Sequence, residues 1–476
     1  MFVSLFFPVF LGVTAALFFV LPGKWRPALL LLSSYLFCGW LDVRALAVLV
    51  LVSLCVWRTG LAIERQGQRQ KKSRRYLILA VGFGVALLGM YKYVPYFSIR
   101  FNLFGEFQQG LTERLAMPVG LSFYLFQAIG YLVDIYKGKS HAEKSFLYLG
   151  CYLAYFPKLV SGPIEREEEF LPQIKGLKDV KFYDRGRLST AFTYMLWGYF
   201  MKMVVADRLA VTVNGIFDAP EAFDSFWLVI GTLFYTIQIY CDFAGYSYIA
   251  VGCSAIFGIR LTQNFRAPYR AANITDFWRR WHVSLSSWLR DYLYIPLGGN
   301  RKGTVRKCIN TLAVFLVCGM WHGSGFNFVV WGLLHGIYSV LETLGRKAGL
   351  KLKGGRIVTF LAVAFAWIFF RAGSFGAAMR YIEGMFTAGI KTEMWGQYME
   401  LLHLNAVEVA VILTGILVIW LVDELCYRKK LHLPAMIQYQ QNAARYLVFY
   451  MLIVAIFIFG MYGPGYHAEQ FIYMQF

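Results

Sequence analysis

Long apolar segments recur along the whole chain, with short polar stretches between them. Many approach 20 residues, which is about the length of α-helix that crosses a hydrocarbon core of about 30 Å. Because backbone polar groups in lipid must be satisfied internally, the pattern predicts an all-α polytopic membrane protein of roughly 11–13 transmembrane helices. The expected spans are 2–21, 27–41, 44–62, 76–97, 117–136, 146–160, 188–210, 225–258, 308–320, 326–343, 357–370, 405–422 and 446–462.

The composition agrees with one integral membrane domain over residues 1–476. Hydrophobic residues make up 58% of the chain, and the mean hydropathy is +0.51. This is more apolar surface than one soluble core can bury. The first segment, Phe2 to Val20, has no basic leader, so we expect it to be retained as a helix. The 8 cysteines lie singly in apolar stretches, which favours core side chains over disulfides or zinc ligands.

The formal net charge is +20, from 47 Lys and Arg against 27 Asp and Glu. These bases gather in short loops between apolar segments, which indicates membrane orientation and no nucleic-acid partner. The loop between the third and fourth spans is therefore expected to be cytoplasmic, as are the loops around 346–356 and 428–445. Counting spans from these loops places both termini on the extracytoplasmic side.

Two segments, 161–187 and 259–305, are too polar to span a bilayer and too aromatic for ordinary loops. Both are expected to be re-entrant or interfacial. Within the second, the spacing of polar and apolar residues from Asp276 to Tyr292 predicts an amphipathic helix with His282 at the seam between its faces. Thr275 is its expected N-cap, and the sequence after Pro296 is its expected stop.

The main chemical candidate is His322, which directly follows an apolar run. An ionisable side chain at membrane depth must find a partner or a wet cavity, so it indicates a functional site. A neutral imidazole suits acyl transfer because it can take a proton from a hydroxyl near neutral pH. The alternative is a structural histidine bonded to a carbonyl group. His335 repeats the local pattern of Trp, His and Gly, and position alone does not rank the two.

The remaining polar residues offer fewer clues. Asp242, four residues after Gln238 in an apolar run, can orient a cavity histidine, pair with an arginine of 260–301, or form a purely structural ion pair. His141, His403, His432 and His467 lie in or near loops and are expected to be solvated. The spacing of His282 and His322 matches no metal-ligand pattern, so no metal site is expected.

Several stretches together closely resemble the membrane-bound O-acyltransferase family, in its bacterial branch of alginate O-acetyltransferases and teichoic-acid D-alanyl transfer proteins. The resemblance covers most of the chain and is densest from about 235 to 340, within a core of 117–343. The stretches that carry it are Gln238 to Ser247, Asn264 to Tyr269, Asp276 to Tyr292, Tyr294 to Asn300 and Gly319 to Gly323.

The resemblance implies a catalytic tunnel through a thin membrane centre. It makes His322 the counterpart of the family's invariant histidine and His282 its partner across the tunnel. Trp321, Asp242, Asp291, Arg280 and Gln238 are the residues expected to line or support that tunnel. The implied activity takes acetyl from cytoplasmic acetyl-CoA, a substrate and not a resident cofactor, and exports it through the bacterial cytoplasmic membrane to a polysaccharide.

The C-terminal helix and tail, 446–476, end in a sequence that resembles the C-terminal motif of the small membrane partner in D-alanylation systems. By that resemblance Tyr473 can hold the acyl group and pass it to an extracytoplasmic transferase. Tyr473 can equally be an aromatic anchor at the membrane surface. The resemblance also implies a secreted or membrane-anchored partner of the serine-hydrolase (SGNH-like) type.

Two other functions fit the sequence. One is transfer of D-alanyl or another acyl group from a carrier protein, against which the fused tail argues. The other is a proton-coupled transporter in which His322 and Asp242 relay protons.

Overall fold

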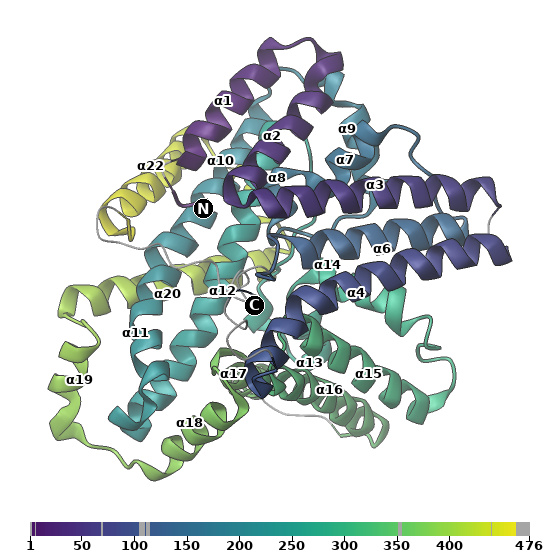
Figure 1. Ribbon diagram of the computed structural model, residues 1–476. Coiled ribbons are helices and arrows are strands. Elements are labelled where there is room, and N and C mark those ends of the chain that lie inside the picture. Colours follow the sequence, from purple (N-terminus) through teal and green to yellow (C-terminus); the bar gives the residue numbers. More distant parts are fainter. Residues whose placement is uncertain are drawn as a thin grey trace. The chain divides into compact units, whose positions relative to one another are not determined.

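The structure is a computed structural model that describes residues 2–4, 6–67, 70–103, 110, 115–350, 355–438 and 440–462. The described part is mostly helical and contains no strand, which confirms the all-α fold (Figure 1). The chain divides into two compact units. Unit 1 comprises Met1–Ser4, Phe192–Ile249 and Gln263–Phe476, and unit 2 comprises Leu5–Ala191 and Ala250–Thr262.

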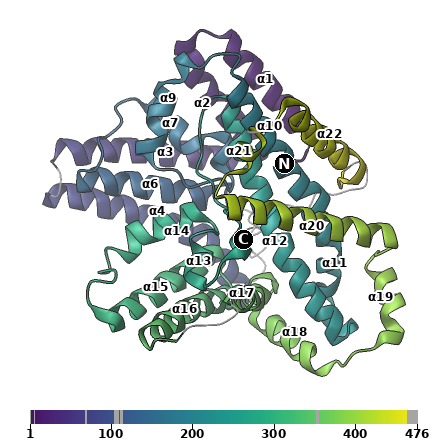
Figure 2. The same cartoon turned by 180° about the vertical axis from the view of Figure 1, so that it is seen from behind.

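Unit 2 holds the first helices of the chain. Among them α3, α4 and α6 lie side by side and pack pairwise against one another (Figures 1 and 2). The helices of this unit are α1 (Phe6–Val20), α2 (Arg26–Leu41), α3 (Val43–Arg65), α4 (Lys71–Phe101), α6 (Leu121–Lys137), α7 (Phe146–Ala154), α8 (Phe156–Leu159) and α9 (Glu167–Lys175).

Unit 1 holds the segments that carry the candidate chemistry. The two divisions between the units fall within α10 (Arg185–Tyr199) and α12 (Ser225–Ile256). The other helices of unit 1 are α11 (Asp207–Asp218), α13 (Ile274–Trp278), α14 (Val283–Leu289), α15 (Gly303–His322), α16 (Phe326–Lys347), α17 (Gly355–Arg371), α18 (Phe375–Thr387), α19 (Trp395–Leu401), α20 (Ala406–Lys429), α21 (Leu433–Gln438) and α22 (Asn442–Phe459).

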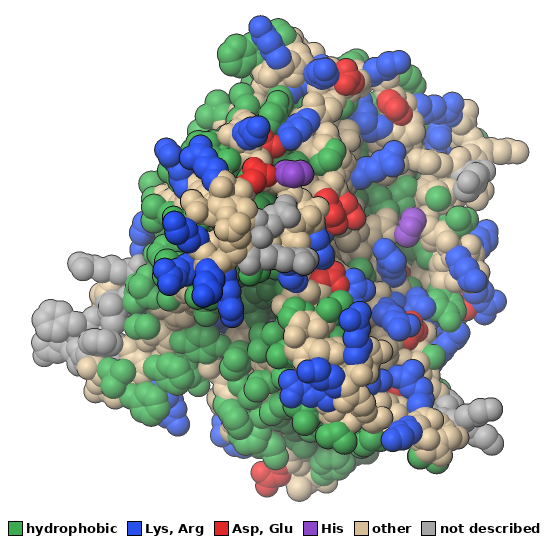
Figure 3. All heavy atoms as spheres, turned by 90° about the vertical axis from the view of Figure 1, so that its right-hand side faces the viewer, with side chains coloured by type: hydrophobic (Ala, Val, Ile, Leu, Met, Phe, Trp, Pro, Cys, Tyr) green, Lys and Arg blue, Asp and Glu red, His purple; other side chains and the backbone are tan. Residues whose placement is uncertain are grey.

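Among the described residues, 7 helices are long and apolar enough to cross a membrane, namely α3, α4, α12, α15, α16, α20 and α22. Large apolar side chains remain exposed along several of them, as at Leu79, Val305 and Phe457. Exposed apolar surface on this scale suits contact with lipid, so the structure supports a multi-pass membrane protein. Figure 3 shows Lys and Arg side chains spread over the face in view, with apolar side chains between and beside them.

Each expected span coincides with helix in the structure, although some are interrupted. The span at 146–160 is split at Tyr155, whose backbone is not helical (φ −50°, ψ 113°), because Pro157 removes a backbone donor and its ring obstructs a continuing helix. The span at 188–210 runs from α10 through a π-helical turn, Phe200–Ala206, into α11. The long segment at 225–258 forms one helix, α12.

The prediction of one amphipathic helix from Asp276 to Tyr292 is wrong, because the segment forms two short helices separated at His282. That residue has a left-handed backbone (φ 44°) between α13 and α14, and a π-helical turn, Arg290–Tyr294, follows α14. The N-cap is also corrected. The Asn273 side chain, and not Thr275, accepts the hydrogen bond from the backbone N–H of Asp276, at 2.8 Å.

Within unit 1, α10 and α12 cross where both carry glycine. A Cβ atom on Gly198 would lie 2.6 Å from the carbonyl oxygen of Gly245, so only glycine allows this approach. Beside the crossing, the buried Lys202 ammonium lies 2.7 Å from the Asp207 carboxylate and also pairs with Asp242. A charge this deep in an apolar protein requires such partners, and the pairs tie the π-helical turn to α12.

The hairpin of α15 and α16 is also built on glycine. A Cβ atom on Gly319 would lie 2.4 Å from the carbonyl oxygen of Phe328, and one on Gly332 would lie 2.4 Å from the carbonyl oxygen of Phe315. Small residues let two membrane helices approach backbone to backbone. This close packing fixes the end of α15, where His322 lies.

Candidate functional site

His322 is the last residue of α15 and is 4% exposed. Its imidazole is enclosed by aromatic rings from three helices. The ring centroids of Trp321, Trp331 and Phe370 lie 4.7, 4.9 and 5.4 Å away. The imidazole is therefore shielded from bulk water by packed rings on several sides.

His282 is fully buried and lies on the same aromatic cluster. Its ring centroid is 4.8 Å from that of Phe243 on α12 and 6.3 Å from that of Trp321. Trp321 therefore contacts both imidazoles, so the structure brings together the three residues that the sequence singles out. His282 lies outside the spanning helices, and its burial lowers the pKa of the imidazole to about 3, which keeps the ring neutral at pH 7.

The turn that presents His282 is held by the segment before α13. The carbonyl oxygen of Asn264 accepts from the backbone N–H of Val283, and its side-chain oxygen accepts from the N–H of Ser284, both at 3.1 Å. Nearby, the N–H of Arg266 donates to the carbonyl of Arg280 at 3.0 Å. These bonds satisfy backbone groups that would otherwise continue the helix, which explains the break at His282.

His335 packs on Trp331, as His322 does, with the ring centroids 5.1 Å apart. Its Nδ1 accepts a hydrogen bond from the indole N–H of Trp278 at 3.3 Å, and its ring stacks on Phe277 at 6.0 Å with an interplanar angle of 8°. His335 thus joins α16 to α13, as a structural histidine does. This contact engages Nδ1 of His335 in packing between the two helices.

The end of α17 is held against this cluster by Asn327. Its side-chain amide donates to the carbonyl oxygens of Phe369 and Ala372, at 3.1 and 2.9 Å. These bonds satisfy carbonyl groups that have no partner within the helix. They also fix Phe370, which lies between them in sequence and packs on His322.

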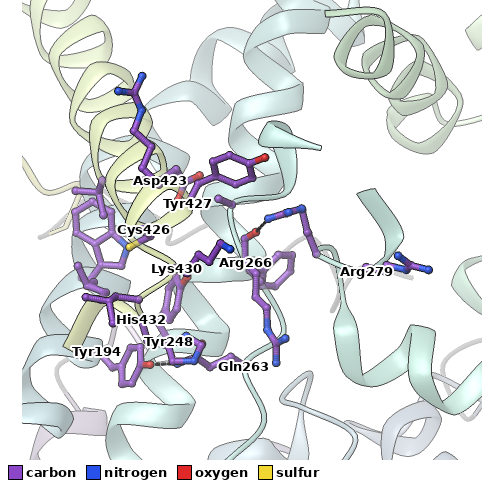
Figure 4. Close-up of a pocket in the computed structure, with 18 of the residues that line it drawn as sticks. Tyr194, Tyr248, Gln263, Arg266, Arg279, Asp423, Cys426, Tyr427, Lys430 and His432 are labelled. Carbon is purple, nitrogen blue, oxygen red and sulfur yellow. Dashed lines mark hydrogen bonds between the residues drawn. The ribbon is translucent and has the colours of Figure 1, made fainter. Parts of the chain in front are cut away.

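A cavity of about 600 Å³ lies within unit 1, between α10, α12, the segment before α14, and the end of α20 with α21 (Figure 4). Phe265 on its wall contacts Phe243 at 5.0 Å, and Phe243 contacts His282. Aromatic rings therefore connect the cavity with the two histidines. Its charged or basic wall residues are Arg266, Arg279, Arg280, Arg428, Lys430 and His432, with Asp276 and Asp423 as the acids.

The cavity walls are fixed by polar contacts. The Arg280 guanidinium lies 2.9 Å from the Asp276 carboxylate and 4.9 Å from the ring centroid of Tyr427 on α20. Figure 4 shows Gln263 bonded to Tyr194, and Arg279 pointing away from the other labelled side chains. Partial burial and the nearby Arg266 charge lower the pKa of His432.

Other predicted residues lie elsewhere. Gln238 is buried in α12, and Asp242 pairs with Lys202 instead of an arginine of 260–301. Asp291 pairs with its neighbour Arg290 at 2.7 Å, partly exposed on the π-helical turn. Tyr473 lies outside the described residues. In the described part of the chain, no group of three His, Cys, Asp or Glu side chains lies close enough to hold a metal ion.

Sequence reasoning missed one wall of the cavity, formed by 422–433. Its charged residues look like an ordinary basic helix end, and only the fold brings them to Arg266 and Arg280. Asp423 was also unexpected. Its carboxylate accepts the hydrogen bond of the Tyr240 hydroxyl, at 3.0 Å, and Tyr240 belongs to the Gln238 to Ser247 stretch. The position of Tyr240 in that stretch was the one feature of the sequence that could have pointed to Asp423.

Comparison with known proteins adds to this geometry. The sequence pattern described as the MBOAT, membrane-bound O-acyltransferase family matches residues 139–370. The chain is 37% identical over 400 residues to the "Probable alginate O-acetylase AlgI" of Pseudomonas putida, covering 82% of this chain and 79% of that protein. It is 33% identical over 421 residues to the "Peptidoglycan O-acetyltransferase" of Helicobacter pylori, covering 81% and 78%. A "Teichoic acid D-alanyltransferase" of Bacillus subtilis is 27% identical over 272 residues, covering 54% and 67%.

Proposed function

Because the chain belongs to the membrane-bound O-acyltransferase family, we propose that it moves acetyl from cytoplasmic acetyl-CoA across the membrane for O-acetylation of an extracellular or cell-wall polysaccharide. The chain is a multi-pass membrane acyltransferase. The observation that carries the finer proposal is one arrangement in unit 1, where a basic cavity is joined through Phe265 and Phe243 to two buried histidines.

The cavity has the chemistry expected of a donor site. Coenzyme A carries phosphate groups, which arginine and lysine bind through charge-assisted hydrogen bonds. Arg266, Arg280 and Lys430 line this cavity, and Lys430 directly follows α20 at an end whose basic residues predict the cytoplasmic side. The acetyl thioester would then reach inward towards the aromatic cluster.

At the cluster, His322 would act as general base. Its neutral imidazole takes the proton of the accepting hydroxyl as that oxygen attacks the thioester carbonyl. The new C–O ester bond forms, the C–S bond breaks, and coenzyme A leaves as a thiol that takes up the proton. His282 would position the carbonyl or help to transfer the proton.

The acceptor is proposed to be a polysaccharide reached through an extracytoplasmic SGNH-like partner. The relatives named as O-acetylating enzymes match more of the chain, at higher identity, than the relative named for D-alanyl transfer. They support acetyl over D-alanyl as the group transferred. Membership of an acyltransferase family likewise favours an enzyme over the transporter considered from the sequence.

Reversing two cavity charges tests the donor site. In an Arg266→Glu, Lys430→Glu variant, loss of charged hydrogen bonds worth about 1.5–3 kcal/mol should raise the KM for acetyl-CoA at least about tenfold. The measurement is acetyl-CoA-dependent release of the coenzyme A thiol by protein in liposomes. The matched pair is Lys430→Glu alone and Lys429→Glu, which makes the same charge change beside the cavity but not on its wall and should leave the KM unchanged. An unchanged KM in the double variant would exclude this cavity as the donor site.

Replacing Tyr473 by phenylalanine tests the acyl relay. If the Tyr473 hydroxyl carries the acetyl group from the tunnel to the partner, Tyr473→Phe should abolish polymer acetylation, because the ester needs that oxygen. If the ring is only an interfacial anchor, phenylalanine should preserve acetylation. Mass analysis of acetyl esters on the polymer, from cells with equal amounts of membrane protein, distinguishes these two outcomes.

A further inference from the structure

Unit 2 contains a second cavity, an apolar groove of about 270 Å³ between α3, α4 and α6. Its floor is buried, as at Val56 and Leu125, whereas Leu79 and Phe83 on its walls are 70% and 46% exposed. Gly84 keeps α4 close to α6 here, since a Cβ atom would lie 3.3 Å from a methyl carbon of Leu125. The groove is therefore a built apolar channel along two spanning helices.

The position of the groove favours a long apolar occupant. Both α3 and α4 have the length and hydropathy of membrane spans. The groove follows α4 from Tyr76 to Gly84, a distance of about 12 Å at 1.5 Å per helical residue. Its walls are apolar apart from the side chains of Cys55, Thr59 and Tyr76. The groove can therefore hold part of a lipid acyl chain, whose apolar chemistry matches these walls.

One end of the groove carries positive charge. Lys72 lies four residues before Tyr76, and Arg75 lies four before Leu79, so each shares a helix face with a residue that lines the groove. On α3, Arg58 lies three residues after Cys55 and is exposed. The basic end is defined as Arg58, Lys72 and Arg75.

The described acids near this end have partners of their own. Asp134 pairs with Lys139 at 3.6 Å, and Glu143 pairs with Lys175 at 2.5 Å. Glu64 lies 2.9 Å from His141 Nδ1 and accepts from the backbone N–H of Ala142 at 3.2 Å. The basic end therefore keeps its charge for another anion. An anionic headgroup placed there leaves its acyl chain at the mouth of the groove.

We propose that this groove holds one acyl chain of an anionic phospholipid, with the lipid phosphate at the basic end formed by Arg58, Lys72 and Arg75. The site is separate from the cavity proposed for acetyl-CoA, so either proposal can fail alone. Each Lys or Arg near a lipid headgroup strengthens binding about fivefold. The groove makes apolar contacts with the acyl chain of any phospholipid, and the basic end makes binding selective for an anionic headgroup.

Native mass spectrometry of the full-length protein in detergent tests the proposal. Phosphatidylglycerol and phosphatidylcholine with the same acyl chains are added at equal concentration. The wild type should retain phosphatidylglycerol about tenfold better or more. Lys72→Ser with Arg75→Ser should lower this preference to at most the roughly fivefold that Arg58 alone supplies. Lys71→Ser with Arg74→Ser removes the same charge from the same turn but away from the groove, so the preference should remain.

A second pair of variants tests the groove itself. Ala80→Phe places a ring inside the groove and should reduce retention of both lipids. Gly82→Phe is the control, because it adds the same ring where no atom lies within 4 Å of the new Cβ position. Its retention of both lipids should match that of the wild type. Equal retention of both lipids by the wild type would overturn the anionic preference. Unchanged retention in a folded Ala80→Phe variant, checked by its elution as one sharp peak, would overturn the assignment to this groove.

Discussion

Replacing His322 by alanine is expected to lower acetyl transfer at least about 100-fold, because general acid–base catalysis contributes about 10²–10⁴ to rate. The structure gives this side chain an enclosed position at the end of α15, against Trp321, Trp331 and Phe370. Alanine removes the proton acceptor and leaves the surrounding rings in place. The measurements are coenzyme A thiol release by the purified protein and acetyl esters on the polymer.

His322→Gln refines this test. Glutamine preserves a polar side chain of similar reach but cannot take a proton at neutral pH, so it should be as inactive as alanine if His322 is the base. A structural role alone would leave much of the rate in His322→Gln. The amount of protein in the membrane and its elution volume should match the wild type, since a misfolded variant would not report on chemistry.

His403→Asn is the matched control for His322. This histidine is exposed and has a left-handed backbone (φ 53°), which asparagine tolerates. Its replacement should leave the rate unchanged. The outcome that contradicts the assignment is retention of activity by His322→Ala. Loss of activity in a well-folded His335→Gln variant, with His322→Ala active, would transfer the role to His335.

The sequence predicted the parts of this protein that depend on local patterns. Apolar length located the helices, because a spanning segment must satisfy its own backbone. The cost of an ionisable group at membrane depth directed attention to His322. The resemblance then paired it with His282, and the structure places Trp321 against both rings.

Features that depend on contacts between distant segments could not be predicted from the sequence. The periodicity from Asp276 to Tyr292 is that of a helix, but Asn264 forms hydrogen bonds with the backbone after His282 and breaks it. An arginine of 260–301 was one expected partner of Asp242. Its partner Lys202 comes instead from a π-helical turn, which the periodicity of the sequence does not reveal. The basic wall at 422–433 could be recognised only from the fold, because the fold brings it to Arg266 and Arg280.

The second large effect is expected at Gly332, where α15 and α16 meet. A Cβ atom there would lie 2.4 Å from the carbonyl oxygen of Phe315 and 3.0 Å from Cα of Gly319. Backbone atoms cannot move aside as a flexible side chain can, so the two helices must separate. Overpacking of this kind costs about 1–3 kcal/mol. Gly332→Val should therefore lower both the melting temperature in detergent and the acetyl-transfer rate.

The rate should fall because the hairpin also positions the base. Trp331, next to Gly332, packs on His322, which lies three residues after Gly319, so separating the helices displaces one ring from the other. Gly345→Val is the control on the same helix, since a Cβ atom there meets its nearest atom, on Leu350, at 3.9 Å. It should keep its melting temperature and rate. A Gly332→Val protein as stable and active as the wild type would show that His322 does not depend on this close contact.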